Sequence, residues 1–80
     1  MFVNEERDLI SKGYMPHENK KAIFSYSKEG KEVYVSYYPF KEDKQYKFSF
    51  PVSYNKQYAA YFTKKDELQK YVRYIIDSHL

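Results

Sequence analysis

An alternation of apolar and polar residues constrains the fold of this chain more than any other feature. Between residues 45 and 54, aromatic or aliphatic side chains occupy every second position, and polar residues or proline occupy the rest. Residues 22–28 and 31–38 follow the same period of two. Because successive side chains of a strand point to opposite faces, each segment has one apolar and one polar face. The sequence therefore predicts an antiparallel sheet with one face buried and the other wetted.

Residues 22–28 and 31–38 are predicted to form a hairpin. They flank Glu29-Gly30, a two-residue loop in which glycine suits the positive φ of a tight turn. The pairs expected on the apolar face are Ala22 with Tyr37, Phe24 with Val35, and Tyr26 with Val33. The pairs expected on the polar face are Ile23 with Ser36, Ser25 with Tyr34, and Ser27 with Glu32. A slip by one residue would bury the serines, so the pattern favours this register.

Two helices are predicted, one before and one after the strands. For the first, Asn4 is the expected N-cap and Gly13 the expected stop in the left-handed conformation. Its expected core residues are Val3, Leu9, Ile10 and Tyr14. For the second, Thr63 and Asp66 form a variant of the capping box. Its apolar residues recur at the spacing of one helical face and are Leu68, Tyr71, Val72, Ile75, Ile76 and His79.

The resulting fold class is α+β, with the order α-β-β-β-(β)-α in a single domain spanning residues 1–80. Residues 58–62 are a candidate fourth strand, so the sheet is expected to have three or four antiparallel strands. Full pairing of residues 58–62 would place Pro51 inside the sheet, where its missing N–H is unfavourable. Because each strand has one apolar face, both helices are expected to pack on the same face.

Composition argues against catalysis and against metal binding. The chain has no cysteine, which excludes disulfides and thiolate metal sites. Its two histidines, His17 and His79, lie far apart in the sequence, and neither has carboxylates at metal-ligand spacing. Both glycines are assigned to turns, so a glycine-rich phosphate loop is excluded. We expect no catalytic residues, no metal site and no cofactor.

The polar face of the sheet is the candidate binding site. Tyr34, Tyr38 and Lys47 form its expected centre, and Tyr58 joins them if the fourth strand forms. Lysines in the flanking loops are expected to surround this centre, and they are Lys41, Lys44 and Lys56. Between residues 20 and 65, ten basic residues outnumber four acidic ones, so the sheet region is a basic block.

Two kinds of macromolecular partner fit such a face. A protein partner is favoured, because tyrosine rings supply rigid contact area and lysines supply charge selectivity. Single-stranded RNA or DNA is the alternative, because bases stack on rings while lysines neutralise phosphates. Lysines outnumber arginines twelve to two, and arginine is the preferred residue for bidentate recognition of phosphate, which favours the protein partner. The last strand also offers an edge for pairing with a partner chain or a second copy in a homodimer.

Codon composition and the N-terminal residues suggest the setting of the protein. Residues with AT-rich codons, such as lysine and tyrosine, greatly outnumber residues with GC-rich codons. We therefore expect a gene from a low-GC bacterium or from its phage or plasmid, and such small proteins often act as stoichiometric inhibitors. The acidic first residues lack the apolar run of a signal peptide, and no segment reaches membrane-spanning length. We expect a cytoplasmic protein that is not attached to a membrane.

Overall fold

A computed structural model describes residues 2–38 and 45–80 of the chain. Two helices and five strands follow one another in the order α-β-β-β-β-β-α. Their bounds are α1 Val3–Ser11, β1 Met15–Pro16, β2 Ala22–Lys28, β3 Lys31–Tyr37, β4 Tyr46–Ser53, β5 Lys56–Phe62 and α2 Lys65–Ser78. The strands form one antiparallel sheet in the order β1-β2-β3-β4-β5. The α+β fold is confirmed, with one strand more than the largest number predicted.

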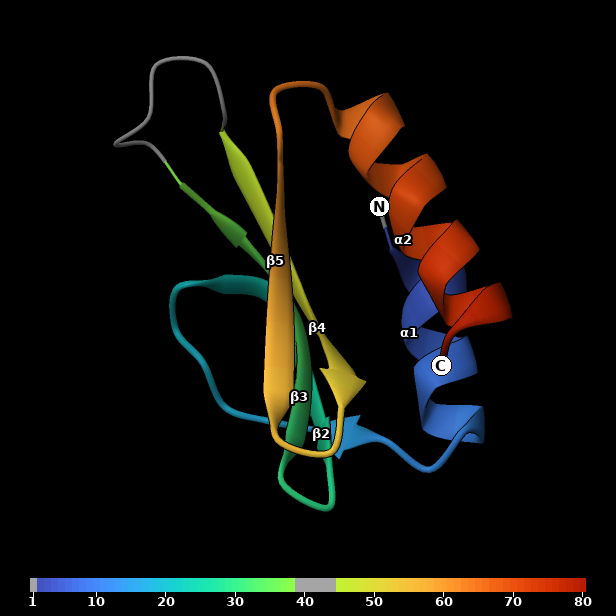
Figure 1. Cartoon of the computed structure of the whole chain (residues 1–80). Helices are drawn as coiled ribbons and strands as arrows, with labels where there is room; N and C mark the ends of the chain where they lie inside the picture. The colour runs from blue at the N-terminus through green and yellow to red at the C-terminus, as the bar shows by residue number, and fades with distance from the viewer. Residues whose placement is uncertain (1, 39–44) are drawn as a thin grey trace.

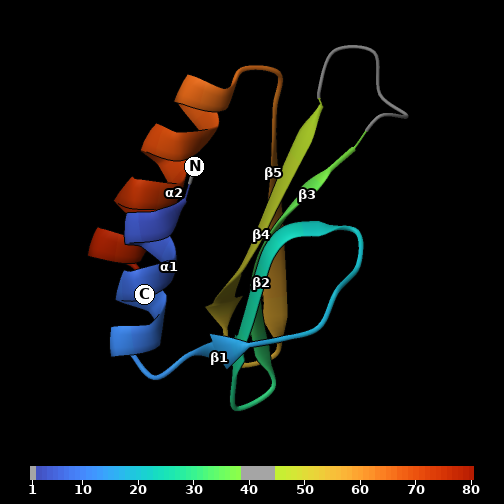
Figure 2. The same cartoon turned by 180° about the vertical axis from the view of Figure 1, so that it is seen from behind.

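Both helices lie on the same face of the sheet and run side by side in the same direction (Figure 1). The view from behind shows the same two layers, with the β1–β2 connection on the other side of the sheet (Figure 2). Apolar side chains between the two layers form the core, and Leu9, Val35, Phe48, Leu68 and Ile76 are among those fully buried. The prediction that both helices cover one face is therefore confirmed.

The hairpin of β2 and β3 has the predicted register over most of its length. Phe24 lies opposite Val35, Ser25 opposite Tyr34, and Tyr26 opposite Val33. The register shifts at a bulge between Ala22 and Phe24, so Ala22 lies opposite Ser36 and the two pairs predicted for this end are wrong. A bulge adds one residue to one strand, which the alternation of residue types does not reveal.

Strand β5 is a full strand, and β4 lies between it and β3. Continuing the β3–β4 register beyond Tyr34 and Ser49 would place Glu32 opposite Pro51, which has no N–H to donate. The Gln57 side chain meets this deficit, because its Nε2 donates to the Glu32 carbonyl at 2.8 Å and to Ser49 Oγ at 3.0 Å. The predicted conflict between Pro51 and a full β5 is therefore resolved by a neighbouring side-chain amide.

Helix α1 differs from its prediction in its cap and in its buried face. Phe2 occupies the N-cap position, and Asn4 makes no capping hydrogen bond. Phe2 is buried and its ring packs 5.1 Å from that of Phe24, so apolar packing sets where the helix begins. Val3 and Ile10, expected in the core, are 63% and 54% exposed.

Gly13 ends helix α1 as predicted. Its φ is +94°, the left-handed conformation, and the N–H of Tyr14 donates to the Leu9 carbonyl at 3.0 Å. The N–H of Gly13 donates to the Ile10 carbonyl at 3.0 Å, which completes a Schellman motif. Leu9 and Tyr14 are buried, as expected.

Helix α2 buries the predicted stripe, but its N-terminus differs from the expectation. Four residues of the stripe are buried and Tyr71 packs against them at the edge of the core. The ring of His79 lies 5.7 Å from that of Phe50, and its Nε2 lies 3.0 Å from the Pro51 carbonyl. Lys64 is the N-cap residue and no side chain caps this end, so the predicted capping box is wrong.

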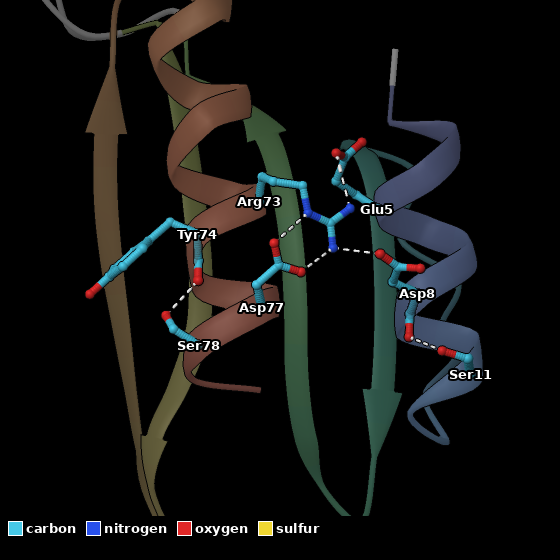
Figure 3. A network of polar contacts seen from close by, with 7 residues as sticks. All are labelled: Glu5, Asp8, Ser11, Arg73, Tyr74, Asp77 and Ser78. Atoms are coloured by element: carbon cyan, nitrogen blue, oxygen red, sulfur yellow. Dashed lines mark hydrogen bonds and ion pairs between the residues drawn. The ribbon is translucent and has the colours of Figure 1, made fainter.

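Arg73 of α2 ties the two helices together (Figure 3). Its guanidinium donates to both carboxylate oxygens of Asp77, at 3.1 and 2.6 Å, and also to Asp8 of α1. Glu5 of α1 lies 3.5 Å from the same guanidinium and is only 4% exposed. Because a buried carboxylate is costly without a partner, this contact explains why α1 turns Glu5 inward and leaves Val3 exposed.

Candidate binding face on the open side of the sheet

The strand registers define which side chains share the face opposite the helices. Tyr34 pairs with Ser25 and Ser49, and Ser49 pairs in turn with Ala59. In the next row, Lys47 lies between Ser36 and Tyr61. Neither described helix lies on this side, where only the β1–β2 connection arches out from the sheet (Figures 1 and 2).

Tyr34 and Lys47 form the centre of this face. The Lys47 ammonium lies 5.5 Å from the centroid of the Tyr34 ring, within the range of a cation–π contact. Hydrogen bonding with the Tyr34 hydroxyl raises the pKa of Lys47 above its ordinary value, and the phenols of Tyr61 and Tyr38 act in the same direction. Partial burial acts against this shift. Lys47 therefore carries its positive charge across the physiological pH range.

Tyr38 and Tyr61 extend the centre towards one end of the strands. Their ring centroids lie 5.5 Å apart with the rings inclined at 61°, an edge-to-face arrangement. Beside them a shallow hollow of about 270 Å³ is lined by Tyr34, Ser36, Tyr37, Tyr38, Lys47, Asn19 and Lys21. Asn19 and Lys21 belong to the β1–β2 connection, which arches out on this side of the sheet (Figure 2). We call Tyr34, Tyr38, Lys47 and Tyr61 the open-face cluster.

The structure brings three of the predicted site residues together and separates two others. Tyr34, Tyr38 and Lys47 lie in the open-face cluster. Tyr58 does not, because it pairs with Phe50 and its ring packs 5.7 Å from the Phe50 ring on the helix-covered side. Lys56 begins β5, five residues before Tyr61, and the rise of a strand places it about 16 Å from the cluster. Lys41 and Lys44 lie outside the described residues.

Tyr58 was assigned to the wrong face because its strand has no clear alternation. Residues 58–62 read Tyr-Ala-Ala-Tyr-Phe, so both faces carry an aromatic residue and an alanine. Pairing Ala60 with Phe48 and Tyr61 with Lys47 settles the faces. The sequence therefore did not reveal Tyr61 as part of the open face. It did not reveal Lys21 either, because Lys21 lies in the irregular β1–β2 connection.

The buried serines show that tyrosine and lysine dominate the accessible part of this face. Ser25 and Ser49 are both buried, although they lie on the side away from the helices. Tyr34, Tyr61 and Lys47 are half-buried and keep part of each side chain at the surface. Ser36 and Gln57 also remain accessible on this side, so the open face presents rings and an ammonium group among polar side chains.

A second hollow, of about 410 Å³, lies at the opposite end of the sheet. Two of the polar groups lining it make structural contacts, since Lys28 Nζ donates to the Lys12 carbonyl at 2.8 Å and His79 Nε2 lies 3.0 Å from the Pro51 carbonyl. Within residues 2–38 and 45–80, no three metal-ligating side chains come together. The side chain of His17 is about half exposed and lies 3.5 Å from Glu32.

Comparisons with known proteins leave the open-face cluster to be interpreted from its geometry. No protein-family model, curated protein or solved structure matches this chain significantly. Of the two helices in the described part of the chain, neither is long and apolar enough to cross a membrane.

Proposed function

We propose that this protein is a non-catalytic binding module that attaches to another protein through the open-face cluster. The observation that supports this proposal most strongly is the gathering of three tyrosines around Lys47 on the face away from the helices. Tyrosine side chains bury a large area with few rotatable bonds, so they provide binding energy at a small entropic cost. Lys47 would select a partner that presents a carboxylate or another hydrogen-bond acceptor.

The contact between Lys47 and Tyr34 favours a protein over single-stranded nucleic acid. A base stacks on an exposed aromatic face, but one face of Tyr34 is already occupied by the Lys47 ammonium. The edge of one ring in the Tyr38–Tyr61 pair also meets the face of the other, which reduces the ring surface on which successive bases could stack. Such a preformed, partly packed cluster suits an irregular protein surface better than a row of bases.

The proposed mode of action is stoichiometric inhibition in the cytoplasm of a low-GC bacterium. The AT-rich residue usage is consistent with a gene carried by such a bacterium or by its phage or plasmid. A small binding module can block a host protein simply by covering its surface. This assignment rests on composition and size, whereas the binding face rests on geometry.

The test is affinity capture with the immobilised protein from a nuclease-treated lysate of a low-GC bacterium. The double variant Tyr34→Ala, Tyr38→Ala is expected to lose a retained protein that the unmodified chain captures, with affinity reduced at least about a hundredfold, because such anchors contribute roughly 2 kcal/mol or more each. Tyr54→Ala is the matched control, since Tyr54 is 85% exposed just after the end of β4 and lies off the cluster. Circular dichroism must show that all variants remain folded.

Two outcomes would contradict the proposal. Equal capture by the double variant and the unmodified chain would place the binding site elsewhere. Binding of a labelled single-stranded oligonucleotide that weakens steeply with salt and requires Tyr34 and Tyr38 would favour the nucleic-acid alternative instead. Lys47→Glu should weaken binding of either partner, because it reverses the central charge while retaining all three rings, so the nuclease treatment and the salt dependence make the distinction.

A further inference from the structure

The two edges of the sheet differ sharply in how they are protected. At one edge, β1 has only two residues and one of them is Pro16, which cannot donate to another strand. At the other edge, β5 runs for seven residues without proline, and its single charged residue is Lys56 at the first position. Long, uncharged edge strands are rare on monomeric proteins, because they invite pairing with another chain. The unpaired main-chain groups at the β5 edge therefore favour pairing with a strand of another chain.

The ladder determines which main-chain groups of β5 face outward. The N–H of His17 donates to the Ser25 carbonyl, and the N–H of Tyr38 donates to the Gln45 carbonyl. Because the direction of these groups alternates along antiparallel strands, the His17 bond sets the phase from β2 to β5, and donation of the Gln45 N–H to the Phe62 carbonyl agrees with it, since this bond turns Phe62 towards β4. With Phe48 opposite Ala60 and Ser49 opposite Ala59, the main-chain groups of Gln57 and Ala59 point away from β4.

Exposed tyrosines flank this edge on the helix side. Tyr58 of β5 is 52% exposed and Tyr74 of α2 is 63% exposed. Figure 3 shows the Tyr74 side chain directed towards the β5 side of α2, away from α1. Tyr71 lies between them, with its ring 6.4 Å from that of Tyr74. These rings are part of an apolar surface that a strand added to β5 would cover.

We propose that two copies of this chain pair antiparallel through β5, with the two-fold axis at Ala59. The two Ala59 residues would then face each other and exchange main-chain hydrogen bonds. Tyr58 of each copy would lie opposite Ala60 of the other, and both residues are on the helix side. The strand is thus complementary to itself, because each large ring meets a methyl group. This pairing does not depend on the proposed function of the open-face cluster.

Charge at the ends of β5 fits the same arrangement. Lys56 is exposed, and by alternation it points to the same side as Tyr58. Antiparallel pairing brings Lys56 of one copy to the end of β5 of the other, where α2 begins. The first turn of α2 carries the exposed acidic residues Asp66 and Glu67. The same end of α2 also carries the exposed Lys64 and Lys65, so its net charge is zero and Lys56 meets no net repulsion there.

The pairing would also double the open face. A two-fold axis perpendicular to the sheet keeps both helical layers on one side and both open-face clusters on the other. One continuous sheet would then present two copies of the proposed binding face to the same side. Such a dimer would bind a repeated or symmetric partner with higher avidity than a monomer.

The register can be tested with a single cysteine, because the natural chain has none. Residues opposite each other in a hydrogen-bonded antiparallel pair have Cβ atoms about 5.5 Å apart, which is too far for an unstrained disulfide but is within reach of a short bifunctional thiol reagent. Ala59→Cys is therefore expected to form a covalent dimer when treated with such a reagent. Ser11→Cys on the exposed end of α1 is the matched control, and it should remain monomeric at the same concentration.

Sedimentation equilibrium of the unmodified chain provides the independent measurement. We expect a dimer that dissociates on dilution, and Ala59→Lys should weaken it at least about tenfold, since two like charges would face each other across the axis. Ala59→Thr, which is uncharged and suited to strands, should preserve the dimer. A chain that is monomeric at every concentration would overturn the proposal. So would a dimer that Ala59→Lys leaves intact, or equal cross-linking of the two cysteine variants.

Discussion

Arg73 illustrates how a single residue can determine the placement of a helix. Its guanidinium contacts three carboxylates, two from α1 and one from α2, and one of these, Glu5, is almost fully buried. The hydrogen bonds to Asp77 and Asp8 raise the pKa of Arg73 above its already high ordinary value, so it stays charged at every relevant pH. The carboxylates of α1 therefore have a permanent counter-ion on α2.

Replacing Arg73 should destabilise the fold without altering the sheet. Arg73→Met would leave Glu5 buried without its counter-ion, and we expect a loss of about 2 kcal/mol, less than for a fully buried pair because the Arg73 side chain is partly exposed. That loss corresponds to a fall in Tm of about 10 °C for a domain of this size. Thermal unfolding followed by circular dichroism measures it, and an unchanged Tm would show that the contacts with Arg73 contribute nothing.

The same contact makes a prediction about acid stability. The hydrogen bond from Arg73 lowers the pKa of Asp77 below its ordinary value of 3.8. A group whose pKa is lower in the folded state stabilises the protein above its unfolded pKa, and this contribution disappears as pH falls through the folded pKa. Arg73→Met should therefore reduce the loss of Tm between neutral pH and pH 3. An identical loss in both proteins would contradict the assignment.

At the scale of elements, the turn between β2 and β3 carries a local conflict. Glu29 has φ +52° and Gly30 has φ +80°, so both central residues adopt the left-handed conformation of a type I′ turn. Glycine adopts the left-handed conformation freely. In glutamate this conformation is sterically unfavourable, and asparagine tolerates it better. The side chain of Glu29 is exposed, so packing does not compensate for this cost.

Glu29→Asn should therefore stabilise the protein by about 0.5–1 kcal/mol. Chemical denaturation at a pH near neutrality measures this change, with Lys31→Asn, just beyond the turn, as a control that should not stabilise. A decrease in stability would mean that Glu29 makes a favourable contribution that its exposed position does not reveal.

Elements were predicted well where one pattern dominated the segment. Alternation predicted β2, β3 and β4, and the apolar stripe of residues 68–76 predicted α2. The two-residue strand β1 was not predicted, because it is too short to show a period of two. It is defined by its pairing with β2. The buried face of α1 was predicted incorrectly, because Glu5 lies inward against Arg73, which is 68 positions away in the sequence.

Residues of the candidate site were likewise predicted correctly only where their strands alternate clearly. Tyr34 and Lys47 were found because their strands alternate clearly, so their faces could be predicted before their pairing was known. Tyr58 was predicted on the open face, where the structure has Tyr61. The prediction failed because an Ala-Ala pair between two aromatic residues leaves the faces of β5 ambiguous. Only the pairing with β4 decides that β5 presents Tyr61, and not Tyr58, beside Lys47.

At the scale of the whole molecule, the two sides of the sheet differ in what covers them. One side supports both helices (Figure 1) and holds the aromatic core. The other side keeps Tyr34, Tyr61 and Lys47 partly accessible. This asymmetry makes a surface for binding available without cost to the core.

The most direct test of this account is site-specific photo-cross-linking in a nuclease-treated lysate. A photoreactive phenylalanine analogue replaces Tyr61 on the open face in one variant and Tyr74 on α2 in another, and both replacements preserve an aromatic ring. We predict that the Tyr61 variant cross-links to a protein other than this chain and that the Tyr74 variant does not. Cross-linking of that protein from Tyr74 alone would contradict the account, because the helical side would then be the binding surface.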